Sequence, residues 1–438
     1  MQAGVWFVVK FAVYTLGCKT NQAESAALTA ALTGRGHTTV DWAGPADAYI
    51  VNTCTVTAAS DAKCRAVIRR ARRAGPHAIV AVLGCLTQRE PEAARVLGAD
   101  LVLGTRDRAE LPSRLEALWR VASGNGQAAA DHDHAAVTPL PRLQGRTRTF
   151  MKIQDGCDGR CSYCVIPGTR GPSVSTPLRV LLPPLLALEN CPEVVVTGIE
   201  ISAWGQDLPG KPGLAELLAE LCGVRPDIRF RVGSLEPAAV GDEFVDRIRH
   251  IPNLCPHFHL PLQSGCDATL AKMARRYNTA QYAAALARLR QAFPQAALTT
   301  DFIAGFPGED EARWRQSLDF FTACDFASAH IFPYSRRPNT AAADLPDQNP
   351  KAVKKERAAQ AAAVAAAAAA RYAATCVGRT VAVAAETHRA GIWTGHAENY
   401  CRVTFAAPAL PDLRRQCALV LITGRDGEKL TGALQSNV

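Results

Sequence analysis

Three cysteines lie within eight residues in the segment CDGRCSYC, as Cys157, Cys161 and Cys164. Thiolates are soft ligands that bind zinc or iron–sulfur clusters, so this spacing predicts a metal site rather than a packing feature. A structural zinc site needs a fourth Cys or His ligand nearby, and none follows in the next 25 residues. Three protein ligands on a four-iron cluster would leave one iron open to an external molecule, which indicates a catalytic site.

The chain has 438 residues, 15 of them cysteine, and a formal net charge of +9. This length predicts two or three domains, and the modest basic excess permits an RNA partner without requiring one. The apolar stretch VWFVVKFAVYTLG contains Lys10 and no cleavage pattern follows it, so we expect a first strand rather than a signal peptide. No other stretch is long enough to cross a membrane. We therefore expect a cytoplasmic protein without a membrane partner, in which closely spaced cysteines indicate metal or redox chemistry rather than disulfides.

Strand-like and helix-like runs alternate over residues 1–121, which predicts a parallel sheet flanked by helices. Residues 122–147 are small, polar and aperiodic and are expected to form a linker. The alternation resumes over residues 148–375, whose alanine-rich end, 351–375, predicts one long helix. Residues 376–438 contain short strand-like runs with glycine turns and predict a small all-β module. The expected fold class is therefore α/β in three parts: an N-terminal βαβ domain, a central domain and the β module.

The spacing C-x3-C-x-aromatic-C, with Tyr163 as the aromatic residue, resembles the signature of radical S-adenosylmethionine (SAM) enzymes. In that family the cysteines hold a 4Fe-4S cluster whose open iron binds S-adenosylmethionine. One electron from the cluster cleaves the sulfonium and releases a 5′-deoxyadenosyl radical. The resemblance implies a catalytic and cluster-binding role for Cys157, Cys161 and Cys164, and a place for Tyr163 in cofactor binding.

Three further cysteines, Cys18, Cys54 and Cys85, each follow an expected strand of the N-terminal region. Strand-end loops on one edge of a parallel sheet converge in space, so these residues can share one site. Their contexts LGCKTNQAES, VNTCTVT and VLGCLTQ resemble those that hold a second 4Fe-4S cluster in the methylthiotransferase subfamily, where it presents sulfur to the substrate. Three unrelated buried thiols are the alternative. Cys64 lies near Cys54 but in an expected helix, and we interpret it as structural.

Further blocks of the central region also resemble methylthiotransferases and follow the strands expected of that family's partial TIM barrel. Active-site groups of such barrels lie at the C-terminal ends of strands. The resemblance implies that the polar residues there hold S-adenosylmethionine or shape its pocket: Thr197, Gly198, Ser234, Glu236, Gln263, Ser264 and Asp301. Ordinary polar packing is the alternative for each. In the segment IFPYSRR, an aromatic residue with Arg336 and Arg337 can stack on a base and meet phosphate, or the arginines can lie in a solvated loop.

The C-terminal module resembles the TRAM domain, a small RNA-binding barrel, and a packing cap on the central domain is the alternative. Five arginines of the module can contact phosphates without specifying a sequence: Arg379, Arg389, Arg402, Arg414 and Arg415. The basic run RRARR at 69–73 is interpreted as a solvated helix face rather than a tRNA contact.

Within the subfamily, GCKTNQAES and HIFPYSRRPNTAA most resemble enzymes that act on N6-threonylcarbamoyladenosine at tRNA position 37, next to the anticodon. The resemblance implies a transferase of sulfur-containing groups that methylthiolates C2 of this base, giving 2-methylthio-N6-threonylcarbamoyladenosine. It also implies two 4Fe-4S clusters, S-adenosyl-L-methionine, a reducing electron donor such as flavodoxin or ferredoxin, and a sulfur donor.

Other substrates and another class of protein stay open. The same chemistry can act on isopentenyl-adenosine of tRNA or on an aspartate of a ribosomal protein. A non-enzymatic zinc-dependent RNA-binding protein is the alternative from a different class. One departure bears on the substrate: RGPSVSTP follows the cysteine motif where the family commonly has RGRSRS. Arg170 remains, but the basic contact of this segment to RNA is reduced.

Overall fold

The computed structural model describes residues 8–122, 141, 146–407 and 412–437. The expected linker lies almost wholly outside these ranges. The chain divides into two compact units, one of Met1–Gln144 with Val165–Pro172 and the other of Gly145–Cys164 with Ser173–Val438. The expected central domain and β module thus belong to one unit, and a short segment after the CDGRCSYC motif belongs to the N-terminal unit.

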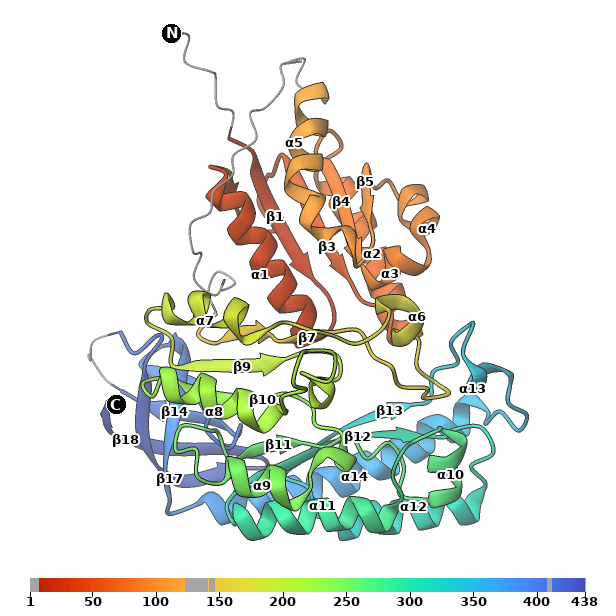
Figure 1. The fold of residues 1–438 in the computed structure, drawn as a ribbon, viewed down its shortest axis with the longest axis vertical. Coiled ribbons are helices and arrows are strands. Elements are labelled where there is room, and N and C mark those ends of the chain that lie inside the picture. The colour runs from red at the N-terminus through yellow and green to blue at the C-terminus, as the bar shows by residue number, and fades with distance from the viewer. Residues whose placement is uncertain (1–7, 123–140, 142–145, 408–411, 438) are drawn as a thin grey trace. The chain divides into compact units, whose positions relative to one another are not determined.

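The first unit is built on five parallel strands (Figure 1). Their order in the sheet is β2 (Thr38–Thr39), β1 (Lys10–Thr15), β3 (Ala48–Thr53), β4 (Ile79–Gly84) and β5 (Leu101–Leu103). The strands β3 and β4 are buried along their whole length. Continuous burial is typical of a parallel sheet covered on both faces.

Helices cover both faces of this sheet. On one face α1 (Lys19–Gly34) and α5 (Leu111–Ala122) pack their leucines against the strands. On the other face lie α2 (Ala58–Ala74) and α4 (Pro91–Val96). The short helix α3 (Cys85–Arg89) packs against α6 (Ile166–Arg170), which follows the cysteine motif in the chain. The helix pattern predicted for residues 1–121 is therefore present, with α6 as an addition.

The second unit contains six parallel strands that follow one another in chain order. They are β6 (Thr149–Lys152), β9 (Glu193–Thr197), β10 (Arg229–Val232), β11 (His257–His259), β12 (Ala297–Ala304) and β13 (Ser328–Pro333). Parallel bridges from Phe230 to Leu254 and from Ser234 to His259 join the two three-stranded halves. A short antiparallel pair, β7 (Gln154–Asp155) and β8 (Val174–Ser175), flanks the cysteine loop. The expected α/β fold with parallel sheets is confirmed.

Helices connect the six strands. They are α7 (Leu178–Leu186), α8 (Leu214–Val224), α9 (Asp242–Ile248), α10 (Asp267–Lys272), α11 (Thr279–Ala292) and α12 (Glu311–Ala323), and α13 (Ala341–Asp344) follows the last strand. Short 3-10 helices lie at Ile201–Ala203 and Pro237–Ala239, and one of the first unit lies at Asp107–Glu110.

The long alanine-rich helix α14 runs over Lys351–Cys376, as its composition predicts. One stripe of it is buried, at Ala361, Ala365, Ala368, Ala369, Ala373 and Cys376. This stripe lets the helix pack closely on β12, β13 and α12.

The C-terminal module is a closed five-stranded barrel. Its strands are β14 (Thr380–Arg389), β15 (Ile392–Ala397), β16 (Arg402–Ala406), β17 (Cys417–Asp426) and β18 (Lys429–Asn437). Arg229 of β10 donates to the carbonyl oxygen of Ala382 at 2.6 Å, and Arg231 donates to that of Glu398 at 2.8 Å. Both arginines also pair with the fully buried Glu193 of β9. These buried bonds hold the module on the central strands. In the described part of the chain, no helix is both apolar and long enough for a membrane span.

Candidate active site

The cysteine motif forms a loop after β7 whose sulfur atoms make bonds with neighbouring segments. The thiol of Cys157 donates to Oε2 of Glu200 at 2.9 Å, and Nη1 of Arg275 donates to Sγ of Cys161 at 3.1 Å. Burial, reinforced by the hydrogen bond to Glu200, raises the pKa of the Cys157 thiol to about 12, with a smaller contribution from the nearby Cys164. The three thiols are half-buried and carry no disulfide.

The backbone of this loop runs close to the sulfur atoms at Gly159. A Cβ atom at Gly159 would lie 3.0 Å from Sγ of Cys157 and 4.0 Å from Sγ of Cys161. Ser162 fixes the loop through its N–H to the carbonyl oxygen of Met273 at 3.0 Å and through its hydroxyl to that of Lys272 at 2.7 Å. The loop therefore offers three half-buried thiols, and this donor set fits an iron–sulfur cluster.

Glu236 is held beside this loop by Arg275. The guanidinium donates to both carboxylate oxygens of Glu236, at 2.7 and 2.8 Å. Its carbon lies 4.9 Å from the centre of the Tyr277 ring, whose hydroxyl donates to the carbonyl oxygen of Pro261 at 2.7 Å. Burial raises the pKa of Glu236, although Arg275 opposes the shift. One arginine thus joins a cysteine of the motif to a predicted pocket residue.

Gln154 organises the turn after β9. Its Oε1 accepts from the N–H groups of Ile199 at 3.0 Å and Glu200 at 2.9 Å, and its Nε2 donates to the carbonyl oxygen of Gly156 at 2.7 Å. A Cβ at Gly198 would lie 2.9 Å from Oε1 of Gln154, so only glycine permits this approach. The amide of Gln154 therefore places Glu200 against the cysteine loop.

The other predicted pocket residues differ in their surroundings. Thr197 is buried at the end of β9, Ser234 is exposed after β10, and Gln263 is half-buried with a φ of +63°. Ser264 is fully buried, with its hydroxyl 3.1 Å from that of Ser317 on α12. Packing against α12 explains the position of this hydroxyl, and Ser264 is not part of the proposed pocket. Tyr163 lies with its ring centre 6.4 Å from that of Phe306 in an apolar cluster.

Asp301 joins two histidines from neighbouring strands. Its Oδ1 lies 3.2 Å from Nδ1 of His330 on β13, and its Oδ2 lies 3.4 Å from Nε2 of His259 on β11. Although burial favours the neutral carboxyl, the bonds to His259 and His330 hold the pKa of Asp301 below its usual value. The side chain of His330 is 71% exposed, so the group reaches solvent.

The N-terminal trio lies at the ends of β1, β3 and β4 within the first unit. Cys18 is exposed, whereas Cys54 and Cys85 are buried. Burial, opposed by Arg170, raises the pKa of the Cys85 thiol to about 11, with smaller contributions from the nearby Cys54 and Cys18 thiols. The three residues that sequence reasoning grouped are therefore neighbours in space.

Glycines permit the close approach of these strand-end loops. Gly17 has a φ of +105°, and a Cβ there would lie 3.1 Å from Sγ of Cys54. Gly84, directly before Cys85, has a φ of +108°, and a Cβ there would lie 2.7 Å from the carbonyl oxygen of Thr53. Left-handed φ values of this kind favour glycine.

Cys64 lies on α2 and bonds to the backbone of Cys54. Its sulfur accepts from the N–H of Cys54 at 3.4 Å and its thiol donates to the Cys54 carbonyl oxygen at 3.3 Å. Burial raises the pKa of Cys64 to about 12. These contacts support the structural role that we assigned to it.

Neither trio has the geometry of a one-ion site. Within the described ranges, no group of three His, Cys, Asp or Glu side chains is arranged around a single metal ion. A four-iron cluster spaces its thiolates more widely than one ion does. Each trio offers three thiols, and this donor set fits such a cluster.

The basic segments are partly buried. Arg337 is 4% exposed and Tyr334 is also buried, so the expectation that both arginines of IFPYSRR can meet phosphate is wrong for Arg337. Arg170, which we expected as the remaining RNA contact of its segment, is also buried. Arg72 of the RRARR run bonds to the carbonyl oxygen of Gly98.

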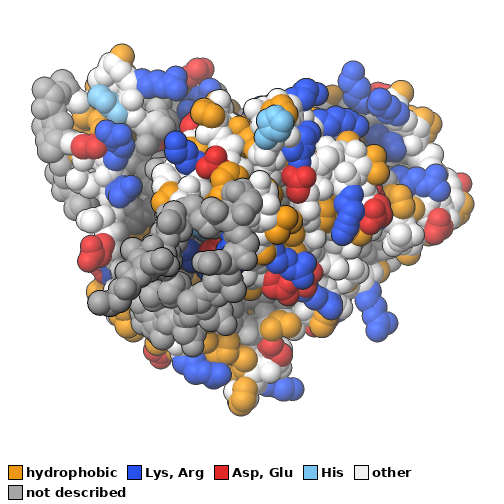
Figure 2. Space-filling view, turned by 90° about the horizontal axis from the view of Figure 1, so that it is seen from above, with side chains coloured by type: hydrophobic (Ala, Val, Ile, Leu, Met, Phe, Trp, Pro, Cys, Tyr) orange, Lys and Arg blue, Asp and Glu red, His pale blue; other side chains and the backbone are white. Residues whose placement is uncertain are grey.

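Exposed arginines are nevertheless present. They include Arg69, Arg73, Arg389, Arg402, Arg414 and Arg415. Figure 2 shows lysine and arginine side chains interspersed with acidic ones on the face that it draws.

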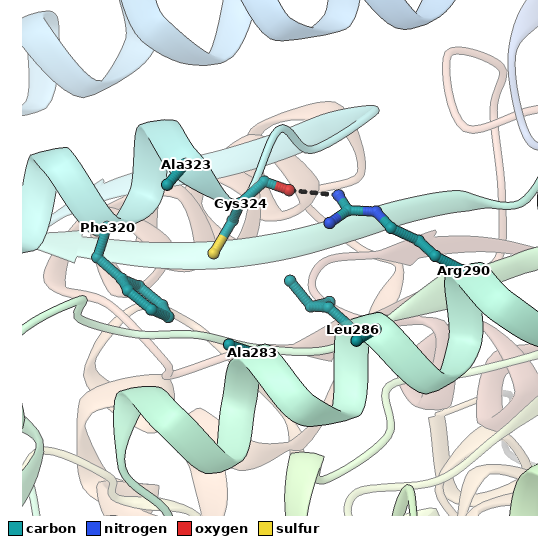
Figure 3. Close-up of a pocket in the computed structure, with 7 residues that line it drawn as sticks. Ala283, Leu286, Arg290, Phe320, Ala323 and Cys324 are labelled. Atoms are coloured by element: carbon teal, nitrogen blue, oxygen red, sulfur yellow. Dashed lines mark hydrogen bonds between the residues drawn. The ribbon is translucent and has the colours of Figure 1, made fainter.

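An apolar groove of about 410 Å³ lies between α11 and α12, away from the cysteine loop in the sequence. It is lined by Leu286, Phe320 and Cys324 among others, and Arg290 donates to the carbonyl oxygen of Cys324 at its side (Figure 3). Its described lining residues include neither a carboxylate nor a histidine. The groove is therefore unsuited to the chemistry of the cysteine sites.

Sequence reasoning missed Gln154, Glu200 and Arg275. Glu200 lies in the block TGIEISAWGQDL, two positions after Gly198, so its position after a strand end was a usable signal. Gln154 and Arg275 act through contacts with distant segments, and no local pattern marks them.

The chain is similar to known proteins over most of its length. Residues 10–104 match the model described as uncharacterized protein family UPF0004, and residues 151–321 match the radical SAM superfamily. The threonylcarbamoyladenosine tRNA methylthiotransferase MtaB of Bacillus subtilis is 33% identical over 406 residues, which cover 90% of each chain. A tRNA-2-methylthio-N(6)-dimethylallyladenosine synthase of Thermus thermophilus is 32% identical, covering 88% of this chain and 83% of that protein.

A solved structure shares the fold. The radical S-adenosylmethionine methyltransferase TsrM from Kitasatospora setae, with cobalamin and a 4Fe-4S cluster bound, aligns with a TM-score of 0.56 at 16% identity. The alignment covers 89% of this chain and 81% of that one.

Proposed function

The chain belongs to the radical SAM methylthiotransferases, enzymes that use S-adenosylmethionine and 4Fe-4S clusters, and from this we propose its substrate and its division of labour. We propose that it transfers a methylthio group to C2 of N6-threonylcarbamoyladenosine at position 37 of tRNA. The observation that carries the proposal is the presence of two separate cysteine trios, one in the loop after β7 and the other at the ends of β1, β3 and β4.

In this proposal Cys157, Cys161 and Cys164 hold the cluster that binds S-adenosylmethionine at its open iron. When bound, the cluster and S-adenosylmethionine supply a radical able to attack the strong C2–H bond of an adenine. The carboxylates of Glu200 and Glu236 lie beside this loop. A carboxylate is suited to the ammonium group or the ribose hydroxyls of S-adenosylmethionine.

Other pocket residues have supporting roles in the proposal. Thr197, Gly198, Ser234 and Gln263 lie at or after the C-terminal ends of β9 to β11, the end where such barrels place their active-site groups, and Asp301 lies within β12. Tyr163 packs against Phe306 and stabilises the fold of the cysteine loop from its apolar side.

Cys18, Cys54 and Cys85 would hold the second cluster, which provides the sulfur. Exposure of Cys18 supports this role, because a cluster that delivers an atom to a substrate needs an accessible side. A reductant such as flavodoxin or ferredoxin and a sulfur donor are required partners in this proposal.

The substrate is supported by the relatives. Three threonylcarbamoyladenosine enzymes, from Bacillus subtilis, Thermotoga maritima and Rickettsia prowazekii, are 31–33% identical to this chain. The enzyme from Thermus thermophilus, named for N6-dimethylallyladenosine, is nearly as similar at 32%, and this makes the isopentenyl-type base the second candidate.

If the two clusters have separate roles, a change at the second cluster should abolish methylthiolation and leave cleavage of S-adenosylmethionine intact. Cys18→Ala removes one ligand of the second cluster and leaves the first trio intact. We expect the anaerobically reconstituted variant to release 5′-deoxyadenosine from S-adenosylmethionine at the wild-type rate without methylthiolating tRNA. Cys161→Ala should abolish both activities.

The matched control for this experiment is Cys64→Ala, because Cys64 is a buried neighbour of Cys54 outside the trio. It should retain methylthiolation. If Cys18→Ala lost S-adenosylmethionine cleavage as completely as Cys161→Ala, the two-cluster assignment would be wrong.

A further inference from the structure

Arg170 is a buried cation in the N-terminal unit, although it follows the cysteine loop of the other unit in the chain. It comes six positions after Cys164 and ends helix α6. Its side chain is 1% exposed and pairs with Glu24 of α1, which is 5% exposed. Nη1 donates to Oε1 of Glu24 at 2.8 Å. A cation buried to this degree has a specific structural partner rather than RNA.

The second amino group of Arg170 reaches Asn21, and Asn21 joins two of the cysteine loops. Nη2 of Arg170 donates to Oδ1 of Asn21 at 2.9 Å. Nδ2 of Asn21 donates to the carbonyl oxygens of Leu16 at 2.8 Å and Thr53 at 2.9 Å. Leu16 lies two positions before Cys18, and Thr53 lies directly before Cys54. The amide therefore holds these two loops at a fixed separation.

Arg170 also acts on the third loop. Its guanidinium is a hydrogen-bond partner of the Cys85 side chain. Helix α6 packs against α3, whose first residue is Cys85. The Thr105 hydroxyl fixes the end of α6 by donating to the carbonyl oxygen of Thr169 at 3.1 Å. All three cysteine loops are thus linked to the Arg170 guanidinium, two of them through Asn21 and the third through Cys85.

Glu24 faces a second positive charge in addition to Arg170. Arg108 forms a second ion pair with Glu24. Arg170, Arg108 and Glu24 together carry a net charge of about +1 at neutral pH, and the Asp61 carboxylate also acts on Cys54. Positive charge and N–H donors near cluster sulfurs favour the reduced cluster, because reduction adds a negative charge.

We propose that Arg170 is the positioning residue of the N-terminal cluster: it fixes the three cysteine loops through Asn21, Glu24 and Cys85, and it raises the reduction potential of the cluster. The inference rests on the proposed cluster at Cys18, Cys54 and Cys85. It gives the segment between Cys164 and Arg170 a function, since the same short stretch carries a ligand of one cluster and a neighbour of the other.

The test measures the potential of the N-terminal cluster alone. The parent protein is the full chain with Cys157, Cys161 and Cys164 replaced by alanine, reconstituted anaerobically with iron and sulfide. In this parent, Arg170→Met leaves Glu24 paired with Arg108. We expect the variant to bind iron and to be at least tenfold harder to reduce, which for one electron is a shift of about 59 mV to more negative potential.

Two further variants make the result specific. Arg170→Lys keeps the charge but cannot reach Glu24, Asn21 and Cys85 together, and it should shift the potential in the same direction by less. Arg73→Met removes an exposed arginine of the same unit and should leave the potential unchanged. The potential is read from the electron paramagnetic resonance signal during a redox titration, with circular dichroism as the check of folding.

Equal potentials in Arg170→Met and Arg73→Met would overturn the inference and leave the proposed function intact. Should the methionine variant fail to fold, the lysine variant decides by the same comparison with Arg73→Met. A parent that binds no iron–sulfur cluster would overturn the proposed N-terminal cluster, and the inference with it.

Discussion

Arg275 joins a cysteine of the CDGRCSYC loop to a carboxylate that follows a neighbouring strand. Its guanidinium donates to Sγ of Cys161 and to both oxygens of Glu236, and its side chain is only 8% exposed. A bidentate bond between buried partners fixes orientation as well as distance. The carboxylate is thereby held in one place beside the cysteine loop.

This contact predicts the behaviour of Arg275→Met. Each hydrogen bond to a charged group contributes about 1.5–3 kcal/mol, and the substitution removes two bonds that orient Glu236. We expect release of 5′-deoxyadenosine to fall at least tenfold while the iron content stays at the wild-type value, because the three thiols are retained. The assay is anaerobic turnover of S-adenosylmethionine with dithionite.

The control for this prediction is Arg288→Met, which removes an arginine paired with Asp242 on the exposed face of α11. It should leave the cleavage rate unchanged. Wild-type cleavage in Arg275→Met would show that Glu236 needs no such support.

At the scale of elements, α14 depends on small side chains. Ala369 is 3% exposed in the stripe that packs on β12 and β13, whereas Ala366 of the same helix is exposed. Inserting methylene groups into a packed contact costs about 1–3 kcal/mol. We therefore expect Ala369→Leu to lower the free energy of unfolding by this amount.

Ala366→Leu makes the same chemical change on the solvent side and should be nearly neutral. Thermal unfolding followed by circular dichroism compares the two variants. Equal melting temperatures would mean that α14 can move away from the strands without cost.

The ion-pair network between β9, β10 and the C-terminal barrel predicts a pH dependence. Glu193 is fully buried, and although burial favours its neutral form, Arg231, Arg229 and Arg148 hold the pKa of this carboxyl well below its usual value. A folded-state pKa below the unfolded value of about 4.3 stabilises the protein at neutral pH. This contribution is lost as the pH falls below about 5 toward the folded-state pKa.

Glu193→Gln should lower the free energy of unfolding by about 3–5 kcal/mol at pH 7, because it leaves buried arginines without their carboxylate. It should also make the free energy of unfolding decrease less between neutral and acidic pH than it does in the wild type. Glu216→Gln, at a half-exposed ion pair with Arg247, should do neither. Urea unfolding at a series of pH values measures both effects, and equal pH profiles for wild type and Glu193→Gln would contradict the assignment.

For the whole molecule, the features that the sequence predicted are local ones. Alternation of strands and helices, the run of alanines and the spacing of cysteines each lie within a short stretch, so the elements and both trios could be recognised. The strand-end position of Cys18, Cys54 and Cys85 was enough to group them, because parallel strands bring their ends together.

The features that were missed are pairings between distant residues. Arg170 and Glu24 are 146 positions apart, and nothing in either local sequence indicates the other. Arg170 and Arg337 looked like solvent-facing charges because their burial depends on the assembled fold. The C-terminal barrel was expected as a separate part because its strands are local, whereas its attachment through Arg229 and Arg231 is long-range.

The most direct test of the central claim is mass spectrometry of tRNA nucleosides. The chain would be expressed in a bacterial strain that lacks its own tRNA methylthiotransferases and that therefore accumulates both unmethylthiolated bases. We predict conversion of N6-threonylcarbamoyladenosine to its 2-methylthio form, with isopentenyl-adenosine unchanged. Methylthiolation of isopentenyl-adenosine instead would contradict the proposed substrate, and absence of any methylthiolated nucleoside, with both clusters loaded, would contradict the proposed activity on tRNA.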